Sequence, residues 1–207
     1  MARYTGPVCR ICRRFGDKLM LKGDKCVTKC TLDRRSAPPG PPPARRRKLS
    51  DHAMQLREKQ KARYTYGVLE KQFVDYFKEA VRLPGVTGDN LVRLLELRLD
   101  NVVYKLGFGV SLKAARQVVR HGHIMLNGRK TDIPSAATRA GDVIGWTPAS
   151  KKSEHFKIAK ENMSAKQPPA WLSVDSEQMT GRVVAAPAVS ETMTKFDPAV
   201  IVEYYSR

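Results

Sequence analysis

The sequence predicts an α+β protein that is mostly helical, with one β-hairpin and a four-cysteine metal knuckle on a basic N-terminal arm. Three observations support this fold class. Apolar residues recur at helical spacing through much of residues 49–120. The dipeptide Asn127-Gly128, the strongest short signal for a hairpin turn, follows that region. All four cysteines lie within the first 30 residues.

The cysteines form two close pairs, C-x-x-C and C-x-x-x-C, with 13 residues between them: Cys9, Cys12, Cys26 and Cys30. Two such pairs allow four thiolates to converge on one tetrahedral ion. We expect no secretory signal, because the N-terminus has no apolar run, and a disulfide framework is therefore disfavoured. One structural zinc ion is expected, with an iron–sulfur cluster as the alternative. The polar loop of residues 13–18 predicts that the metal, not an apolar core, supplies the folding energy.

The charge of the chain is concentrated near its N-terminus. The formal net charge is +18, of which +13 lies in residues 1–66. A proline-rich, extended linker at residues 36–44 runs into four adjacent cations at 45–48. Such asymmetry favours an arm that binds a polyanion, with nucleic acid first, over a tail that only aids solubility. No apolar stretch approaches the roughly 20 residues that a membrane-spanning helix needs.

Four helices are expected after the linker. Ser50 and Ser111 precede two of them and have the side chains preferred at N-caps. Pro84 and Gly85 end another, and Gly107 ends the apolar stripe that follows. The expected extents are 51–61, 69–83, a single helix from about 87 to 106, and 112–120.

The last of these helices carries three cations at spacings of three and four: Lys113, Arg116 and Arg120. We expect them to share an exposed face, and because no anion lies among them, phosphate contact is favoured over simple solvation. The hairpin of residues 123–131 carries Arg129 and Lys130 just beyond its tip, and a second turn precedes residues 143–146.

Aromatic residues of the nearly neutral last third are expected to pack in the core or against protein, in preference to stacking on bases. These residues are Phe156, Trp171, Tyr204 and Tyr205.

Four motifs resemble one protein family: MARYTGP at 1–7, LSDHAMQLREKQK at 49–61, RLDNVVYKLGF at 98–108 and ARQVVRHGHIMLN at 115–127. Over essentially its whole length the chain resembles the S-four family of bacterial small-ribosomal-subunit proteins. The last two motifs resemble the RNA-binding module named after that family. The sequence departs from the family pattern at PPGPPPA (38–44), where PPGQHG is usual, and in the second cysteine pair, which commonly has four intervening residues.

The resemblance implies a domain organisation. Residues 1–47 would form the basic arm, with the four-cysteine knuckle and the proline-rich linker. Residues 48–92 would form a helical domain completed by 179–207. Residues 93–178 would be an inserted helix-helix-β-hairpin RNA-binding domain with a core module at 97–146.

The resemblance also implies a function. The chain would be a cytoplasmic, structural constituent of the small ribosomal subunit, a primary ribosomal-RNA-binding protein that nucleates assembly of the subunit body. Its partners would be that RNA, neighbouring proteins (especially S-five, at an interface linked to decoding accuracy) and messenger RNA near its entry path, without a membrane or small-molecule substrate. We expect no enzymatic activity, because no Walker loop, dinucleotide glycine pattern or zinc-binding histidine pair is present. A non-ribosomal RNA-binding, RNA-modification or assembly factor with the same module is the alternative.

The residues expected to contact RNA are mostly cations. They are Arg3, Arg10, Arg13, Arg14, Arg45, Arg46, Arg47, Lys48, Arg57, Lys59, Lys61, Arg63, Lys113, Arg116, Arg120, His121, Asn127, Arg129 and Lys130.

Overall fold

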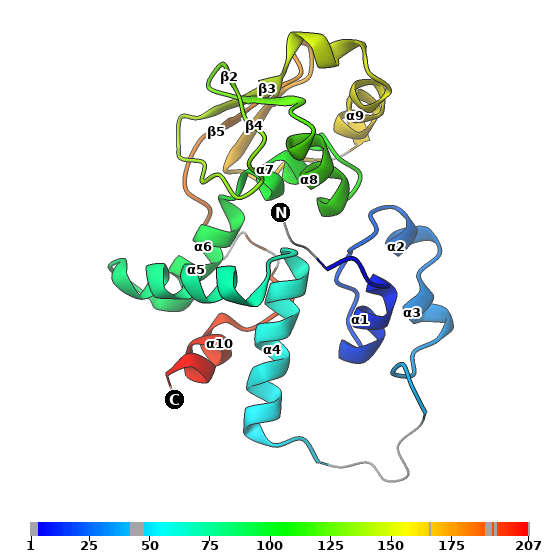
Figure 1. The fold of residues 1–207 in the computed structure, drawn as a ribbon, viewed down its shortest axis with the longest axis vertical. Helices are drawn as coiled ribbons and strands as arrows, with labels where there is room; N and C mark the ends of the chain where they lie inside the picture. Colours follow the sequence, from blue (N-terminus) through cyan, green and yellow to red (C-terminus); the bar gives the residue numbers. More distant parts are fainter. Residues whose placement is uncertain (1–3, 42–47, 166, 189–191, 193, 207) are drawn as a thin grey trace. The chain divides into compact units, whose positions relative to one another are not determined.

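The computed structural model describes residues 4–41, 48–165, 167–188, 192 and 194–206. The chain forms two compact units, residues 1–92 with 194–207 and residues 93–193 (Figure 1). The helices are α1 (Val8–Phe15), α2 (Lys25–Thr28), α3 (Thr31–Arg34), α4 (Asp51–Thr65), α5 (Glu70–Arg82), α6 (Thr87–Glu96), α7 (Leu99–Lys105), α8 (Leu112–Arg120), the 3-10 helix η1 (Pro148–Lys152), α9 (Glu154–Ala165) and α10 (Pro198–Tyr205). The strands are β1 (Ile124–Leu126), β2 (Arg129–Lys130), β3 (Val143–Trp146), β4 (Leu172–Asp175) and β5 (Thr180–Val183). None of the described helices is long and apolar enough to cross a membrane.

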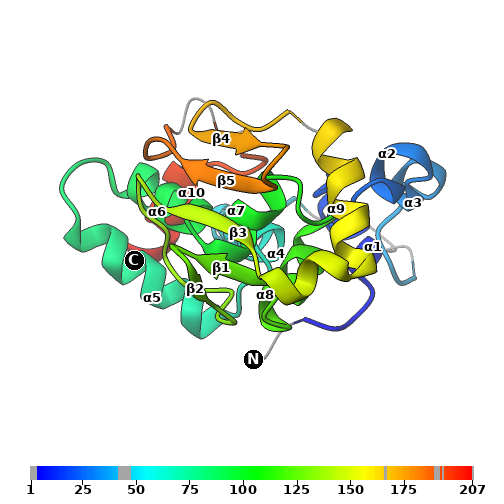
Figure 2. The same cartoon turned by 90° about the horizontal axis from the view of Figure 1, so that it is seen from above.

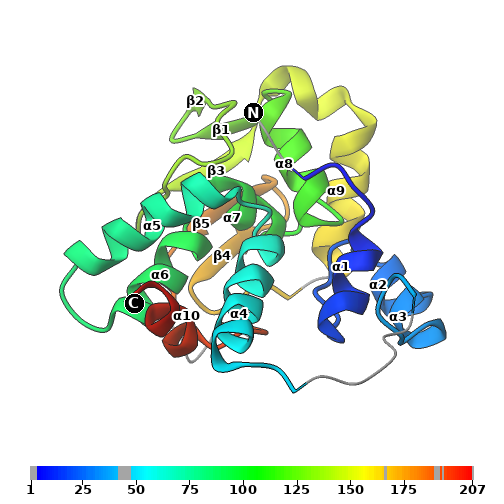
Figure 3. The same ribbon diagram turned by 60° about the horizontal axis from the view of Figure 1, so that its bottom comes forward.

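Two helices of the first unit, α4 and α10, begin at residues whose side chains cap them. The Ser50 hydroxyl accepts a hydrogen bond from the Ala53 amide at 3.3 Å, as the sequence predicts, and α4 runs one turn further than expected. The C-terminal helix α10, whose cap is Asp197, packs beside α4 (Figure 3). The chain therefore returns from the second unit to complete the first.

The N-terminal helices contain a small apolar core. Val8, Ile11 and Phe15 recur at helical spacing on α1 and are each no more than 6% exposed. Leu19 and Leu21 fold onto them, and Tyr64 of α4 packs against the cluster. The expectation that this segment has no core is wrong, because its apolar residues gather on one face of α1 although its loops are polar.

The second unit contains a five-stranded antiparallel sheet in the order β2-β1-β3-β5-β4 (Figure 2). The predicted β1–β2 hairpin is confirmed. Asn127 and Gly128 at its tip have φ angles of 50° and 77°, as the two central positions of a type I′ turn require. On the other side of β3, β5 lies very close to the end of α7, since a Cβ atom at Gly181 would be 2.4 Å from a methyl group of Leu106, the C-cap residue of α7.

The boundary expected between residues 178 and 179 does not coincide with a boundary between the two units. The expected boundary falls inside the β4–β5 hairpin, in which Asp175 pairs with Thr180. Because β5 also pairs with β3, both strands belong to the second unit, which extends to residue 193. The last segment of the first unit begins at 194.

The expected single helix over 87–106 is two helices, α6 and α7, with a break at Arg98. Arg98 has an extended backbone (φ −69°, ψ 137°) and forms an isolated β-bridge with Ala137. The amides of Leu99 and Asp100 donate to the carbonyls of Ala136 and Pro134 at 2.9 and 3.0 Å. Hydrogen bonds from a distant segment thus replace the helical ones at the break.

The aromatic residues of the last third pack inside the units, as predicted. Trp171 is 2% exposed, and Phe156 packs edge-on against Trp146 with ring centroids 5.4 Å apart. Tyr205 stacks on Phe77 at 4.5 Å. These side chains are therefore not arranged as base-stacking platforms.

Candidate nucleic-acid interface

The four cysteines lie together although they come from three helical segments. Cys9 and Cys12 are one turn apart on α1, Cys26 is in α2, and Cys30 is the N-cap residue of α3. All four line one small cavity and none forms a disulfide. Within the described residues, no three Cys, His, Asp or Glu side chains are close enough to hold a metal ion. The thiols therefore share a cavity but do not form a closed coordination shell.

The surroundings of this cavity bear on the charge of the thiols. Burial raises the pKa of the Cys12 thiol, a backbone hydrogen bond at Leu19 opposes this, and the other three cysteines raise the pKa further. The Lys22 amide donates to Cys26 Sγ at 3.3 Å. Lysines 22, 25 and 29, which sequence reasoning did not single out, line the same cavity.

Two cations of α4 that were predicted to bind RNA instead form ion pairs and ring contacts within the first unit. Lys59 is 4% exposed, forms an ion pair with Glu70, and lies 5.0 Å from the ring centroid of Tyr204. Arg63 lies 3.8 Å from the same Glu70 carboxylate and places its guanidinium 4.5 Å from the ring centroid of Tyr64. Both side chains connect helices of this unit.

Arg57 and Lys61 of α4 hold the N-terminal helices to it. The Arg57 guanidinium donates to the Phe15 carbonyl at the end of α1. Lys61 forms ion pairs of 2.8 Å with both Asp17 and Glu58. Partial burial alone would lower the pKa of Lys61, but the hydrogen bonds to these two carboxylates outweigh it and raise the pKa.

Arg116 does not belong to the exposed face predicted for α8. It is 7% exposed, and its Nη1 donates to Asp100 Oδ2 at 3.0 Å. Arg98 contacts both oxygens of the same carboxylate, at 3.1 and 2.8 Å. The expectation that Arg116 is presented outward is therefore wrong, because the face of α8 that packs on α7 includes this position.

The other predicted residues of the second unit are exposed: Lys113, Arg120, His121, Asn127, Arg129 and Lys130. Arg120 lies 3.8 Å from Asp132, and both side chains are more than half exposed. Asn127 has a structural task as well. Its amide donates to Asp142 Oδ1 and accepts from the Val143 amide, both at 2.8 Å, so it braces the hairpin tip against the second turn.

In the first unit the predicted cations with exposed side chains are Arg10, Arg14 and Lys48. Arg13 is partly buried and donates through Nε to the Ala37 carbonyl at 2.8 Å, which holds the chain entering the proline-rich segment. Arg3, Arg45, Arg46 and Arg47 lie outside the described residues.

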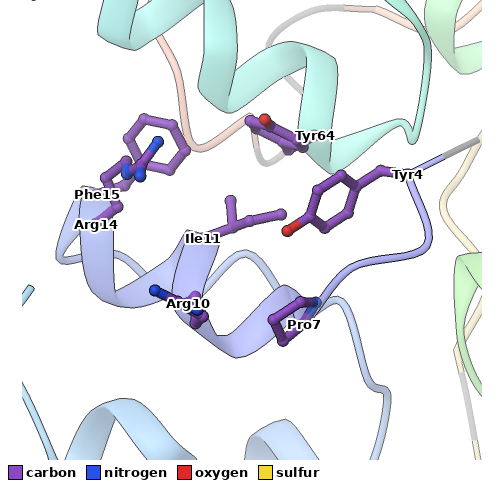
Figure 4. A pocket seen from close by; sticks show the side chains of 7 residues that line it. All are labelled: Tyr4, Pro7, Arg10, Ile11, Arg14, Phe15 and Tyr64. Atoms are coloured by element: carbon purple, nitrogen blue, oxygen red, sulfur yellow. The ribbon is translucent and has the colours of Figure 1, made fainter. Parts of the chain in front are cut away.

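Sequence reasoning missed a hollow beside α1. It is lined by Tyr4, Pro7, Arg10, Ile11, Arg14, Phe15 and Tyr64 (Figure 4). Aromatic residues interleaved with arginines in a basic arm are the one signal in the sequence that could have indicated it. Tyr64 is distant in the sequence, so only the fold brings it to this place.

The chain is similar to known proteins along its whole length. The family described as "Ribosomal protein S4/S9 N-terminal domain" matches residues 3–96, and the family described as "S4 domain" matches residues 97–144. Proteins named small ribosomal subunit protein uS4 from Dehalococcoides mccartyi and Pelotomaculum thermopropionicum are each 53% identical to it, over the full length of both chains. The relative of that name from Syntrophomonas wolfei is 54% identical, again over both full lengths. The chain belongs to the uS4 family.

In this member of the uS4 family, the motif at residues 98–108 contributes buried side chains to the interior of the RNA-binding module. Arg98, Asp100 and Asn101 are all buried. The Asn101 amide donates to the main-chain carbonyl and the carboxylate of Glu96, at 2.9 and 2.7 Å. The motif therefore joins α6 to α7, and the predicted RNA-binding cations of the module that are exposed lie on α8 and the hairpin.

Proposed function

We propose that this chain is a structural component of the small ribosomal subunit and binds its ribosomal RNA. The observation that carries this proposal is the match of about half of all residues to proteins named for that subunit, over the full length of both chains. In this role the protein acts by binding and positioning RNA. The alternative, a modification or assembly factor, is not favoured, because the shared sequence extends far beyond the RNA-binding module.

The charge distribution supports recognition of phosphates and shape. Base-paired RNA hides the base edges of its major groove and displays phosphates and 2′-hydroxyls. Seven of the predicted RNA-binding cations are exposed and suited to such contacts: Lys113, Arg120, Arg129 and Lys130 of the second unit, and Arg10, Arg14 and Lys48 of the first. The buried or internally paired Lys59, Lys61 and Arg116 are not proposed to touch RNA.

The direct test is binding to a small-subunit ribosomal RNA transcript, with a large-subunit transcript as competitor, across a series of salt concentrations. If six to ten phosphates are neutralised, the affinity should fall by about 10³-fold or more between 50 and 200 mM salt. The protein should also stay with the small subunit through a high-salt wash. Equal affinity for both transcripts, or loss in the wash, would favour the modification or assembly factor.

The family resemblance supports a finer version of this role. The protein would bind early in assembly, contact the neighbouring protein S-five and lie near the messenger entry path. Reconstitution of the small subunit without this chain should then stall early and should be rescued by adding it back. Particles that assemble fully without it would contradict the early role.

A metal at the four cysteines is a further part of the proposal. Cys9, Cys12, Cys26 and Cys30 would hold one zinc ion, with an iron–sulfur cluster as the alternative. The shared cavity supports this, since all four cysteines line it although they come from three helical segments. A tetrathiolate zinc site carries a net charge of −2, and the three lysines around the cavity would offset it.

The metal would stabilise a segment that also has a small apolar core. Val8, Ile11 and Phe15 of α1 are buried, whereas no residue of α2 or α3 is buried, so we expect metal removal to loosen α2 and α3 more than α1. Elemental analysis of anaerobically purified protein should find about one zinc per chain, or iron with cluster absorbance. Cys12→Ser should lose the metal, and Val27→Ala, at a 70% exposed position beside Cys26, should keep it. Protein with neither metal would overturn this proposal.

A further inference from the structure

We infer that the hollow beside α1 binds a single unstacked nucleotide of the ribosomal RNA. Its base would lie against Tyr4 and Tyr64, and its phosphate would lie at Arg10 and Arg14. This inference rests on the proposed function and specifies one site within it. We refer to the hollow lined by the seven residues of Figure 4 as the tyrosine hollow.

Aromatic rings form the sides of the tyrosine hollow. The rings of Tyr4 and Tyr64 meet edge to face, with centroids 5.5 Å apart and planes at 75°. Phe15 lies 6.2 Å from Tyr64 on another side, and the Arg63 guanidinium lies 4.5 Å from the Tyr64 centroid. Contacts from these directions hold Tyr64 in place before any ligand arrives. Aromatic side chains can stack on any base, because every base has a π-face.

Positive charge lies beside the rings. Arg10 and Arg14 are four residues apart on α1, so their side chains project from the same side of the helix. Both are exposed, and among the described residues neither guanidinium has an ion-pair or hydrogen-bond partner. The cations of α4, by contrast, are paired internally. Among the described residues that line the hollow none is acidic, and the two arginines favour an anionic group there.

The size of the tyrosine hollow favours a single ring system. Its volume is about 170 Å³, whereas pockets for drug-sized ligands hold roughly 300–1,000 Å³. The side chains of Ile11 and Phe15, each 6% exposed, make part of its lining apolar. Apolar and aromatic side chains beside two arginines match a flat base with an attached phosphate.

The position of Tyr4 depends on Gly6. The Tyr4 side chain folds back over the chain, and a Cβ atom at Gly6 would be 2.5 Å from the Tyr4 hydroxyl oxygen. Gly6→Ala therefore displaces the ring without removing it. It is a second way to disturb the tyrosine hollow that leaves the charge of the protein unchanged.

The test compares variants of the full chain in binding to small-subunit ribosomal RNA. Tyr4→Leu should weaken binding by about fivefold or more, the range found for loss of one stacked base. Gly6→Ala should also weaken it, and Tyr4→Phe should bind like the wild type because the ring is kept. None of these three should change the salt slope. Arg14→Gln should reduce the slope by about one charge. Circular dichroism checks that each variant is folded.

Ultraviolet cross-linking of the wild-type complex supplies an independent measurement. One unpaired nucleotide should cross-link to a peptide that contains Tyr4 or Tyr64, and the Tyr4→Leu complex should lose or weaken that cross-link. Wild-type RNA binding with equal affinity for Tyr4→Leu and cross-links elsewhere would overturn the inference but leave the proposed function intact. A wild-type chain that does not bind the RNA would overturn both.

Discussion

Loss of the Asp100 carboxylate should destabilise the second unit strongly. Asp100 is fully buried and receives hydrogen bonds from Arg98 and Arg116. Asp100→Asn would remove the carboxylate that both buried guanidinium groups contact. Breaking a buried ion pair by removing one partner costs about 3–5 kcal/mol, and we expect Asp100→Asn at the upper end of that range because two ion pairs share this carboxylate.

Arg116→Ala should be milder, because Arg98 still neutralises Asp100. It removes one charge-assisted hydrogen bond of 3.0 Å, worth about 1.5–3 kcal/mol. Arg120→Ala serves as the matched control from the same helix. Its ion pair of 3.8 Å lies in solvent, with Arg120 54% exposed, so its effect on stability should stay within about 0.5 kcal/mol.

Urea unfolding followed by tryptophan fluorescence isolates this effect. The chain has two tryptophans, Trp146 and Trp171, which are 1% and 2% exposed and both belong to the second unit. RNA binding should show the opposite ranking. Folded Arg116→Ala should keep the wild-type salt slope, and Arg120→Ala should have a shallower one. A stable Arg116→Ala variant with a reduced salt slope would refute the structural role given to Arg116.

Three further predictions concern other parts of the chain. Lys59→Met should leave the RNA affinity and its salt slope unchanged in filter binding, because the ammonium is buried beside Glu70; a slope lower by one charge would contradict this. Burial, together with the charges of His155, His121 and Lys130, lowers the pKa of His123, so the folded state favours the neutral ring. The second unit should then lose stability as the pH falls below about 6.5, where the unfolded chain takes up more protons. The urea midpoint should show this loss, and His123→Gln should reduce it. Gly128→Ala should cost about 1–2 kcal/mol in the same unfolding assay, since its φ of 77° strains any residue with a Cβ atom; an unchanged midpoint would argue against the type I′ turn.

The parts of the fold that the sequence predicted are those with local causes. Ser111 caps α8 at the expected residue, where its hydroxyl accepts from the Ala114 amide at 3.3 Å. The Asn127-Gly128 turn likewise depends on its own two residues. The break at Arg98 has a distant cause, because residues 134–138 supply the partners of that backbone. A periodic apolar stripe cannot reveal such a break.

The candidate interface was predictable as a charge but not as a set of side chains. Arg116 and Arg120 share a helix face by spacing, yet one is buried and the other is more than half exposed. The difference comes from Asp100, which reaches α8 only in the folded unit. For the same reason Lys59 and Lys61 resembled RNA ligands in the sequence, since Glu70 and Asp17 become their partners only through packing.

The place of β5 in the sheet affects how a fragment of this protein should be cut. The family match to the RNA-binding module ends at residue 144, but β5 pairs with the open side of β3 and β4 then pairs with β5. A recombinant fragment that stops at Trp146 would keep the pairing of β3 with β1 but leave the opposite edge of β3 unpaired, and unpaired strand edges promote aggregation. In the intact unit the outer strand is β4, which carries Ser173 and Asp175 at exposed positions. A soluble fragment of the module should therefore continue past Val183.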